Sequence, residues 1–561
     1  MSGQMNAAEP DLPRGADLLA RSLEANGVSR VFTLSGNHIM PIFDALLATN
    51  IEIIHVRHEA AAVHMADAWG RLTGEPGVAL VTGGQGHSNA VAALYTALAS
   101  ESPLVLLSGH AGLDELGRGA FQEMPQADLA RPVTKASWTA SSAVTLCRDV
   151  TDALRLAKTG RPGPVHVSLP VDLLNQRVSP ASAMSAAAES VHPEAQGDPR
   201  TLSRVLAELH RAKRPLVVCG PAICTPRGRA AMREAASALG VPVVGMESPR
   251  GIQDPSLGAL AEVLGQADLL VLVGKPLDFT LRFGVSPALA GDCKLIVLDP
   301  DLSQVARAAR GQADRFLFGE QVGSASAALT SLSAAAESEA RRDSSWAAFV
   351  EDALAYRMPD WASARAREPG RLHPVELCRA VQGFMDEHPD ATLVCDGGEI
   401  GQWPQALVRT ERRLINGVAG TIGVSLPFAM AAKSHRPEHP VVAVMGDGTF
   451  GFHMAELDTA LRHGLPVIVV IGNDARWNAE YQIQLRSYGP ERAKHCDLLP
   501  ARYDQVAEAL GGFGALVCSE EDLAHALRRA YASGKPAVIN VMIESVPAPV
   551  VRRPSPHQGK A

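Results

Sequence analysis

Two acidic residues follow strand-like segments in the C-terminal third of the chain, and their surroundings predict a site for a divalent cation and a phosphate group. Asp447 lies in residues 446–451 (GDGTFG), directly after the apolar run VVAVM. Alone, this pattern matches the GxGxxG turn that binds the pyrophosphate of a dinucleotide, but Asp447 would repel that group unless a cation lay between them. Mg²⁺ is held by one or two carboxylates together with phosphate oxygens, so a second protein ligand is expected. Asn473 and Asp474 end the next apolar run, PVIVVIG, and a helix and a strand return the chain from Asp447 to the same sheet edge.

Two residues in the N-terminal third have side chains suited to proton transfer. Glu59 follows the strand-like segment IEIIHVRH and opens an alanine-rich helix. His38 follows the strand-like segment VFTL and a Gly-Asn turn. The near-neutral pKa of an ordinary histidine suits the exchange of a proton with a substrate oxygen. Both residues are therefore candidates for acid–base chemistry.

The elements that must position these residues alternate along the chain. Short apolar runs such as VALVT, PLVVCG and VVAVMGDG alternate with alanine-rich segments of helical period, a pattern that predicts parallel sheets built from βαβ units. The alternation occurs in three blocks, so we predict three doubly wound α/β domains at 13–178, 200–340 and 370–547. Residues 179–199 have the polar, Ser/Ala/Pro-rich composition of a linker, and the helical, charged and Ser/Ala-rich residues 324–342 are expected to form a second linker.

Bulk properties exclude several classes of protein. A chain of 561 residues is too long for one hydrophobic core. The net charge of −8 argues against a nucleic-acid partner, and no apolar run is long enough to span a membrane. The N-terminus lacks the pattern of a signal peptide, and the eight cysteines are scattered singly. We expect reduced thiols, a cytoplasmic location and a small-molecule substrate.

Four segments together resemble one enzyme superfamily. Residues 57–71 (RHEAAAVHMADAWGR), 78–97 (VALVTGGQGHSNAVAALYTA), 418–433 (VAGTIGVSLPFAMAAK) and the GDG…ND pair occur in its order. They are similar to thiamine-diphosphate-dependent enzymes of the acetolactate synthase, 2-hydroxyacyl-CoA lyase and benzaldehyde lyase superfamily. The resemblance extends from about Gly15 to Val546 and is strongest to acetolactate-synthase-like 2-hydroxyacyl-CoA lyases.

The resemblance implies thiamine diphosphate and Mg²⁺ as cofactors and assigns site residues. Asp447, Asp474 and the backbone of Arg476 match the metal ligands, although the family usually has asparagine where this chain has Asp474. Glu59 matches the acid that exchanges a proton with the aminopyrimidine ring, so that the amino group can activate the thiazolium carbon. Gln122 matches a residue that faces the thiazolium, and His38 matches a histidine of the benzaldehyde-lyase-like members. The other implied cofactor contacts are Gly83, Gly84, Glu399, Ile400, Ile422, Gly446, Gly448 and Thr449.

The resemblance leaves the substrate open. A lyase or carboligase acting on 2-hydroxyacyl-CoA is the first expectation, followed by an acetolactate-synthase-like decarboxylating carboligase of 2-oxo acids or a benzaldehyde-lyase-like 2-hydroxyketone lyase. A flavin- or NAD-dependent oxidoreductase is the alternative from a different class. The central domain is expected to hold ADP, FAD or nothing, with Asp299 suited to a ribose hydroxyl. Because the family resemblance implies that Glu59 and Asp447 meet across two chains, we expect a homodimer or homotetramer.

Overall fold

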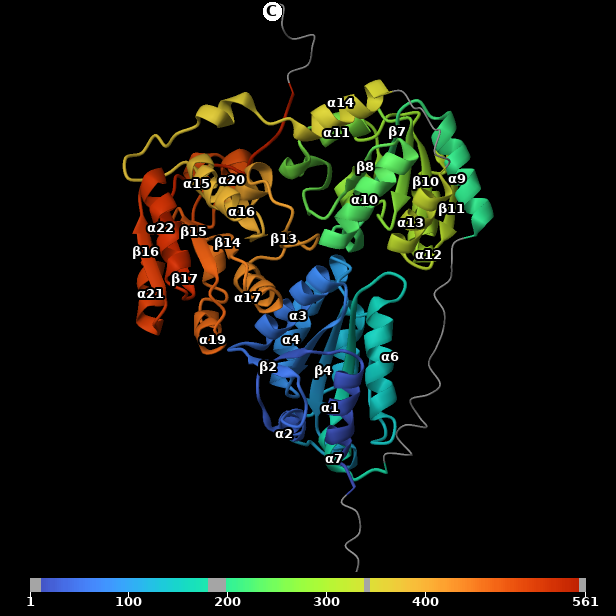
Figure 1. Cartoon of the computed structure of the whole chain (residues 1–561), viewed down its shortest axis with the longest axis vertical. Helices are drawn as coiled ribbons and strands as arrows, with labels where there is room; N and C mark the ends of the chain where they lie inside the picture. Colours follow the sequence, from blue (N-terminus) through green and yellow to red (C-terminus); the bar gives the residue numbers. More distant parts are fainter. Residues whose placement is uncertain (1–11, 180–197, 337–343, 554–561) are drawn as a thin grey trace, which may run out of the picture.

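The computed structural model describes residues 12–179, 198–336 and 344–553, and these ranges form three α/β domains (Figure 1). Each domain contains one sheet in which every paired strand is parallel, as the sequence predicts. The inner strands are runs of buried apolar residues because helices cover both faces of each sheet, whereas the edge strands are partly exposed. Within the described ranges, no helix combines the length and apolarity that a membrane span requires.

The N-terminal domain has a six-stranded sheet in the order β2-β1-β3-β4-β6-β5. Its strands are β1 (Arg30–Thr33), β2 (Glu52–His55), β3 (Gly77–Val81), β4 (Leu104–His110), β5 (Ala136–Thr139) and β6 (Pro164–Pro170). Its helices are α1 (Gly15–Ala25), α2 (Met40–Leu46), α3 (Glu59–Thr73), α4 (Gln85–Ala99), α5 (Gln126–Ala130), α6 (Leu146–Lys158) and α7 (Val171–Asn175).

The C-terminal domain repeats this topology, because its order β13-β12-β14-β15-β17-β16 is the same when the strands are counted from the start of the domain. Its strands are β12 (Thr392–Cys395), β13 (Arg413–Ile415), β14 (Val441–Gly446), β15 (Ile468–Asn473), β16 (Phe513–Val517) and β17 (Ala537–Met542). Its helices are α15 (Pro374–Glu387), α16 (Gly398–Leu407), α17 (Ser425–His435), α18 (Asp447–Phe450), α19 (Glu456–Arg462), α20 (Asn478–Tyr488), α21 (Tyr503–Leu510) and α22 (Glu520–Ala532).

The central domain has a five-stranded sheet in the order β11-β10-β9-β7-β8. Its strands are β7 (Pro215–Cys219), β8 (Val243–Gly245), β9 (Leu269–Val273), β10 (Lys294–Asp299) and β11 (Phe316–Gln321). Its helices are α9 (Pro199–Arg211), α10 (Pro226–Leu239), α11 (Leu260–Leu264), α12 (Leu302–Gly311), α13 (Ala325–Ala335) and α14 (Ser344–Ala355).

The prediction of a second linker at residues 324–342 is wrong for most of the residues that the structure describes there. Residues 325–335 form α13, whose apolar stripe of Ala325, Ala328, Leu329 and Leu332 is buried against the central sheet. Residues 337–342 lie outside the described ranges, as does most of the first predicted linker. Helix α14 lies beyond residue 340, and Val350 and Ala353 place it in the core of the central domain.

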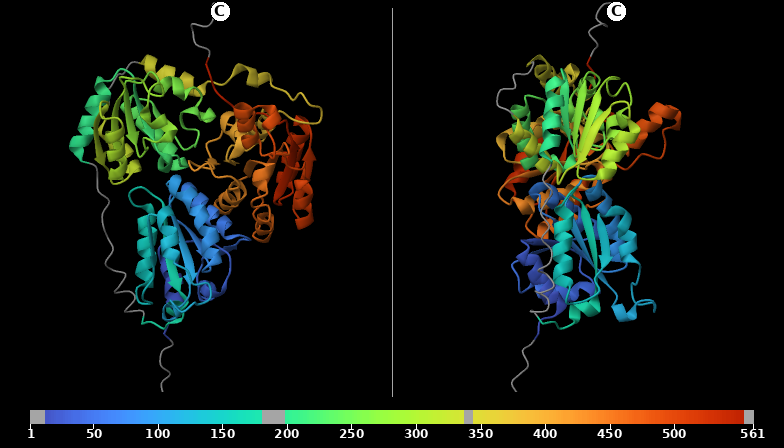
Figure 2. Two further views of the ribbon diagram at one scale, coloured as in Figure 1. Left: turned by 180° about the vertical axis from the view of Figure 1, so that it is seen from behind. Right: turned by 90° about the vertical axis from the view of Figure 1, so that its right-hand side faces the viewer.

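The N-terminal and C-terminal domains share one hydrophobic core. Helix α3 packs against α17, and their buried alanines form one cluster with Phe428 and Met65. Figure 1 shows the blue α3 beside the orange α17, and Figure 2 shows the three domains from two other sides. Arg71 near the end of α3 donates to the carbonyl oxygen of Ile415 at 2.9 Å, which fixes the direction of α3 relative to the C-terminal sheet.

Candidate active site

Two buried carboxyl groups meet where neighbouring strands β14 and β15 end. Gly446 lies opposite Gly472 in the parallel ladder, so Asp447 and Asp474 emerge at the same edge of the sheet. Burial raises the pKa of Asp447 to about 6. Burial and the neighbouring charge of Asp447 raise the pKa of Asp474 to about 7. Asp447 Oδ2 is buried without a hydrogen-bond partner. The pair therefore favours a shared proton or a bound cation.

The side chain of Asn473 fixes the turn that carries Asp474. Its Nδ2 donates to Asn540 Oδ1 at 3.0 Å, and its Oδ1 accepts from the backbone N–H of Ala475 at 3.1 Å. Ala475 has a φ of +55°, a left-handed conformation that a residue with a Cβ adopts only when its surroundings hold it there. Asn473 thus acts on the turn from inside the sheet, and Asp474 faces the cavity.

Arg476 contributes its backbone to this edge and directs its side chain elsewhere. The backbone N–H of Arg476 lies close enough to Asp447 to oppose the rise in the pKa of that carboxyl. Its guanidinium donates to Asp497 Oδ1 at 2.7 Å and lies 4.0 Å from the ring centre of Tyr481. The structure therefore brings together the three predicted metal-binding positions.

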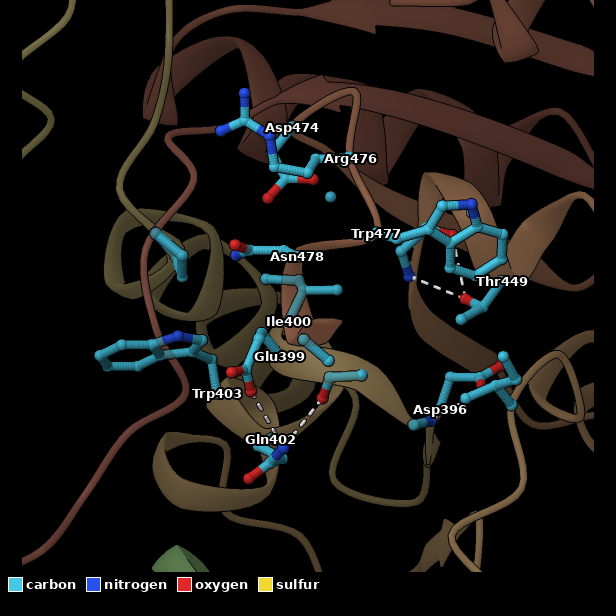
Figure 3. A pocket seen from close by; sticks show the side chains of 18 of the residues that line it. Asp396, Glu399, Ile400, Gln402, Trp403, Thr449, Asp474, Arg476, Trp477 and Asn478 are labelled. Atoms are coloured by element: carbon cyan, nitrogen blue, oxygen red, sulfur yellow. Dashed lines mark hydrogen bonds between the residues drawn. The ribbon is translucent and has the colours of Figure 1, made fainter. Parts of the chain in front are cut away.

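These groups line a cavity of about 240 Å³ between the C-terminal and central domains (Figure 3). Two glycines in its wall allow neighbouring side chains to pack closely against the backbone. A Cβ on Gly448 would lie 2.9 Å from the Trp477 ring, and one on Gly397 would lie 2.7 Å from Ile422 Cγ2. The predicted contacts that line this cavity are Glu399, Ile400, Ile422, Gly446, Asp447, Gly448, Thr449, Asp474 and Arg476.

The predicted residues of the N-terminal domain form a second group around the turn from β3 to α4. His38 Nδ1 lies 3.2 Å from Thr82 Oγ1, and its ring stacks on Phe121 with 6.1 Å between ring centres. Burial lowers the pKa of His38, with a smaller effect from His110, so the imidazole is neutral at pH 7 and can accept a proton. A Cβ on Gly84 would lie 2.6 Å from Gln122 Cβ.

Glu59 belongs to this N-terminal group. It begins α3, is 8% exposed, and accepts from Asn89 Nδ2 at 3.0 Å through Oε2. A Cβ on Gly86 would lie 3.2 Å from Glu59 Oε1 and 2.9 Å from Thr82 Cγ2. Gly86, in the first turn of α4, therefore lies between Glu59 and Thr82, the side chain that contacts His38.

The two groups do not meet within one chain. The lining of the cavity comes from the central and C-terminal domains, and none of its described residues precedes Ser248. Arg71 contacts Ile415, next to the cavity residue Asn416. Glu59 lies twelve residues earlier in α3, which places it about 18 Å along the helix axis from Arg71, at the far end.

In the central domain, the structure places Asp299 in an ion pair. Its buried carboxyl pairs with Arg161, which also pairs with Glu101 of the N-terminal domain. Burial raises the pKa of Glu101 to about 7. The ADP or FAD expected at this domain stays a prediction.

Three residues that the sequence analysis did not select contribute to the cavity or to the N-terminal group of predicted residues. Asp396 accepts from the backbone N–H groups of Gly397 and Gly423 at 2.6 and 2.9 Å, which joins α16 to the Ile422 segment. Gln126 holds the turn beside Gln122, and Arg250 reaches the cavity from the central domain. A position at the end of a strand marks Asp396 in the sequence, whereas no local pattern distinguishes Gln126 or Arg250.

Gln126 is 1% exposed and makes three hydrogen bonds at the turn that carries Gly84. Its Oε1 accepts from the backbone N–H of Gly84 at 2.8 Å, and its Nε2 donates to the Gly109 carbonyl oxygen at 3.0 Å and Ser168 Oγ at 3.1 Å. The side chain of Gln122, four residues earlier and half-buried, makes no hydrogen bond in the described part of the chain. Gln122 is therefore a matched control for a substitution of Gln126.

Gln126→Met is expected to lower the free energy of unfolding by about 2 kcal/mol or more, because it leaves a buried N–H and a buried carbonyl without partners. Gln122→Met should change it by less than about 0.5 kcal/mol, since no hydrogen bond is lost. Denaturant titration of both variants beside the parent chain measures this. Equal stability of the two variants would contradict the assigned role of Gln126.

Family comparisons match all three domains. The domains described as "Thiamine pyrophosphate enzyme, N-terminal TPP binding domain", "central domain" and "C-terminal TPP binding domain" match residues 13–129, 202–320 and 396–541. Together they cover more than half of the chain.

Individual relatives agree with this result. The acetolactate synthase large subunit of Mycobacterium tuberculosis is 33% identical, over 94% of this chain and 95% of its own. The human 2-hydroxyacyl-CoA lyase 2 is 31% identical, over 94% and 90%. A solved Rhodococcus jostii thiamine diphosphate-dependent 4-hydroxybenzoylformate decarboxylase shares the fold, with a TM-score of 0.78, 24% identity and coverage of 95% and 99%. On these matches, the chain belongs to the family of thiamine pyrophosphate enzymes.

Proposed function

We propose that this thiamine diphosphate enzyme cleaves or forms the carbon–carbon bond of a 2-hydroxyacyl-CoA or a similar 2-hydroxy carbonyl compound. One observation carries the choice over decarboxylation of a 2-oxo acid. His38, whose pKa is lowered by burial, contacts Thr82 and stacks on Phe121, the residue before Gln122, so a neutral imidazole is available to take a proton from a substrate hydroxyl. Cleavage of a 2-hydroxy carbonyl requires removal of the hydroxyl proton, whereas decarboxylation of a 2-oxo acid begins with loss of CO₂ and needs no such base.

Mg²⁺ is proposed as the ion at Asp447 and Asp474. Two observations support this fit: Asp447 Oδ2 has no hydrogen-bond partner, and the pKa values of both carboxyls are raised. A bound cation would give Oδ2 a partner and would stabilise both carboxyls in their charged form. Among the described residues, no group of three or more His, Cys, Asp or Glu side chains is arranged to hold a metal. Two carboxylates and the backbone of Arg476 leave octahedral positions for phosphate oxygens, as Mg²⁺ prefers.

Residues of the cavity would hold the cofactor, and residues of the N-terminal group would move protons. Bound thiamine diphosphate supplies a nucleophilic carbon and an electron sink for carbon–carbon bond cleavage. Gly446, Gly448 and the Ile400 segment are proposed to cradle the diphosphate. His38 takes the hydroxyl proton of the substrate as the carbon–carbon bond breaks, and returns it to the alkoxide in the reverse direction. Glu59 exchanges a proton with the aminopyrimidine ring.

We propose at least a homodimer, with a homotetramer as an assembly of two such dimers. The proposal is supported by the position of Glu59 at the far end of α3 from the cavity of its own chain. It is also supported by Phe121, which stacks on His38 and is 68% exposed. A second chain would cover that ring and bring its cavity to Glu59. A cytoplasmic location also stays a prediction.

Asp447→Asn should weaken Mg²⁺-dependent binding of thiamine diphosphate by at least about tenfold, a loss of about 1.4 kcal/mol. Asp474→Asn should have a smaller effect, because the family usually has asparagine at this position, where an amide oxygen binds Mg²⁺. In the parent chain, affinity should rise with pH through about 6 to 7, since the ion displaces protons from carboxyls with raised pKa values.

Calorimetric titration of the cofactor at pH 5.5, 6.5 and 7.5, with and without Mg²⁺, measures these effects. Unchanged affinity in Asp447→Asn would rule out the metal site.

Substrate choice is tested by supplying the purified enzyme in parallel with pyruvate, with a 2-hydroxyacyl-CoA and with a CoA-free 2-hydroxyketone. We expect aldehyde release from the CoA ester and little CO₂ from pyruvate. His38→Gln should lower kcat at least about a hundredfold, the usual contribution of a general base. His525→Gln on the exposed face of α22 serves as the control and should have no effect.

Rapid CO₂ release from pyruvate without turnover of the CoA ester would reverse the proposal in favour of an acetolactate-synthase-like reaction. Cleavage of the CoA-free ketone alone would favour a benzaldehyde-lyase-like reaction.

A further inference from the structure

An ion pair joins two domains at the rim of the cavity. Arg250 comes from the central domain, Glu399 begins the first turn of α16 in the C-terminal domain, and Arg250 Nη2 lies 3.3 Å from Glu399 Oε2. Both residues line the cavity that contains Asp447 and Asp474. The side chain of Arg250 is 44% exposed, whereas that of Glu399 is 6% exposed. The carboxylate is therefore the buried member of the pair.

Glu399 adds a negative charge where the cofactor would bring several more. Six of the described residues that line the cavity are Asp or Glu, and two are Arg. Within the described ranges, Glu399 Oε2 has one other side-chain hydrogen-bond partner, Gln402 Nε2, at the long distance of 3.5 Å (Figure 3). Burial raises the pKa of Glu399, and Arg250 is the largest opposing influence. Without Arg250, a charged Glu399 would repel an entering diphosphate at close range.

Arg250 is the arginine of the cavity that is available for this role. The other, Arg476, is already paired with Asp497. The backbone holds Arg250 in place, because its N–H donates to Ser248 Oγ at 3.3 Å and the next residue, Gly251, has a φ of +55°. A Cβ on Gly251 would lie 2.0 Å from the Thr280 carbonyl oxygen. The turn is therefore packed tightly into the central domain.

We infer that Arg250 is a positioning residue for cofactor binding, an inference that rests on the proposed cofactor site. Its guanidinium neutralises Glu399, so that the anionic diphosphate can enter the cavity. The central domain thereby contributes a charge to a site that is otherwise built by the C-terminal domain. Retention of the cofactor then depends on the docking of these two domains. The effect of Arg250 is indirect and requires the carboxylate at position 399.

A double-mutant cycle tests this dependence. Cofactor affinity is measured by calorimetry with thiamine diphosphate in excess Mg²⁺ for the parent chain, Arg250→Gln, Glu399→Gln and the double variant. Arg250→Gln should weaken binding about tenfold or more. In the Glu399→Gln background, the same substitution should change the affinity by less than about threefold, because the repelling charge is gone. Arg200→Gln, an exposed arginine on α9, is the control and should change it by less than about twofold.

Each other outcome overturns the inference. Equal weakening by Arg250→Gln in both backgrounds would mean that Arg250 binds the diphosphate directly. Unchanged cofactor affinity with a raised KM would mean that Arg250 serves the substrate. Circular dichroism of each variant checks that the fold is kept, and Glu399→Gln with Arg250 intact shows whether loss of the pair by itself disturbs the domains. Failure of the parent chain to bind the cofactor would instead contradict the proposed function.

Discussion

The rest of the site depends on two carboxyl groups that the parallel sheet brings to adjacent strand ends. Asp447 and Asp474 are buried beside each other, and burial raises both pKa values, with the charge of Asp447 raising that of Asp474 further. A divalent cation stabilises both carboxyls in their charged form and creates in turn a place for phosphate oxygens. The Asn473 side chain and the left-handed Ala475 hold the turn in this arrangement. At the rim of the cavity, the positive charge of Arg250 compensates the buried carboxylate of Glu399 in the same way.

The packing of α3 on α17 imposes the second constraint. The shared core of the N-terminal and C-terminal domains holds Arg71 near the cavity and Glu59 at the opposite end of the helix. This core is what prevents the two groups of one chain from meeting, because rotating the domains would expose Met65, Phe428 and their neighbours.

Local sequence predicted the parts of the structure that depend on local rules. Parallel strands end at a common edge, so the order of apolar runs was enough to bring Asp447 and Asp474 together. The helical character of residues 324–342 was predicted, but their serine and alanine content suggested a linker, whereas Ala325, Ala328, Leu329 and Leu332 bury one face of α13 in the central domain. Arg250 was not predicted, because its contact with Glu399 arises from domain docking across 149 positions. The separation of Glu59 from the cavity was implied by the family resemblance, and its physical origin lies in the α3–α17 core.

The most direct test of the shared site is complementation between two inactive variants. Glu59→Gln and Asp447→Asn are purified separately, each is shown to be folded and inactive, and they are then mixed under conditions that allow subunits to exchange. A site built from two chains gives each hybrid dimer one intact site and one doubly altered site, so random exchange should restore roughly a quarter of the parental activity. No activity from a mixture in which hybrids are shown to form, for example by mass spectrometry, would contradict the account.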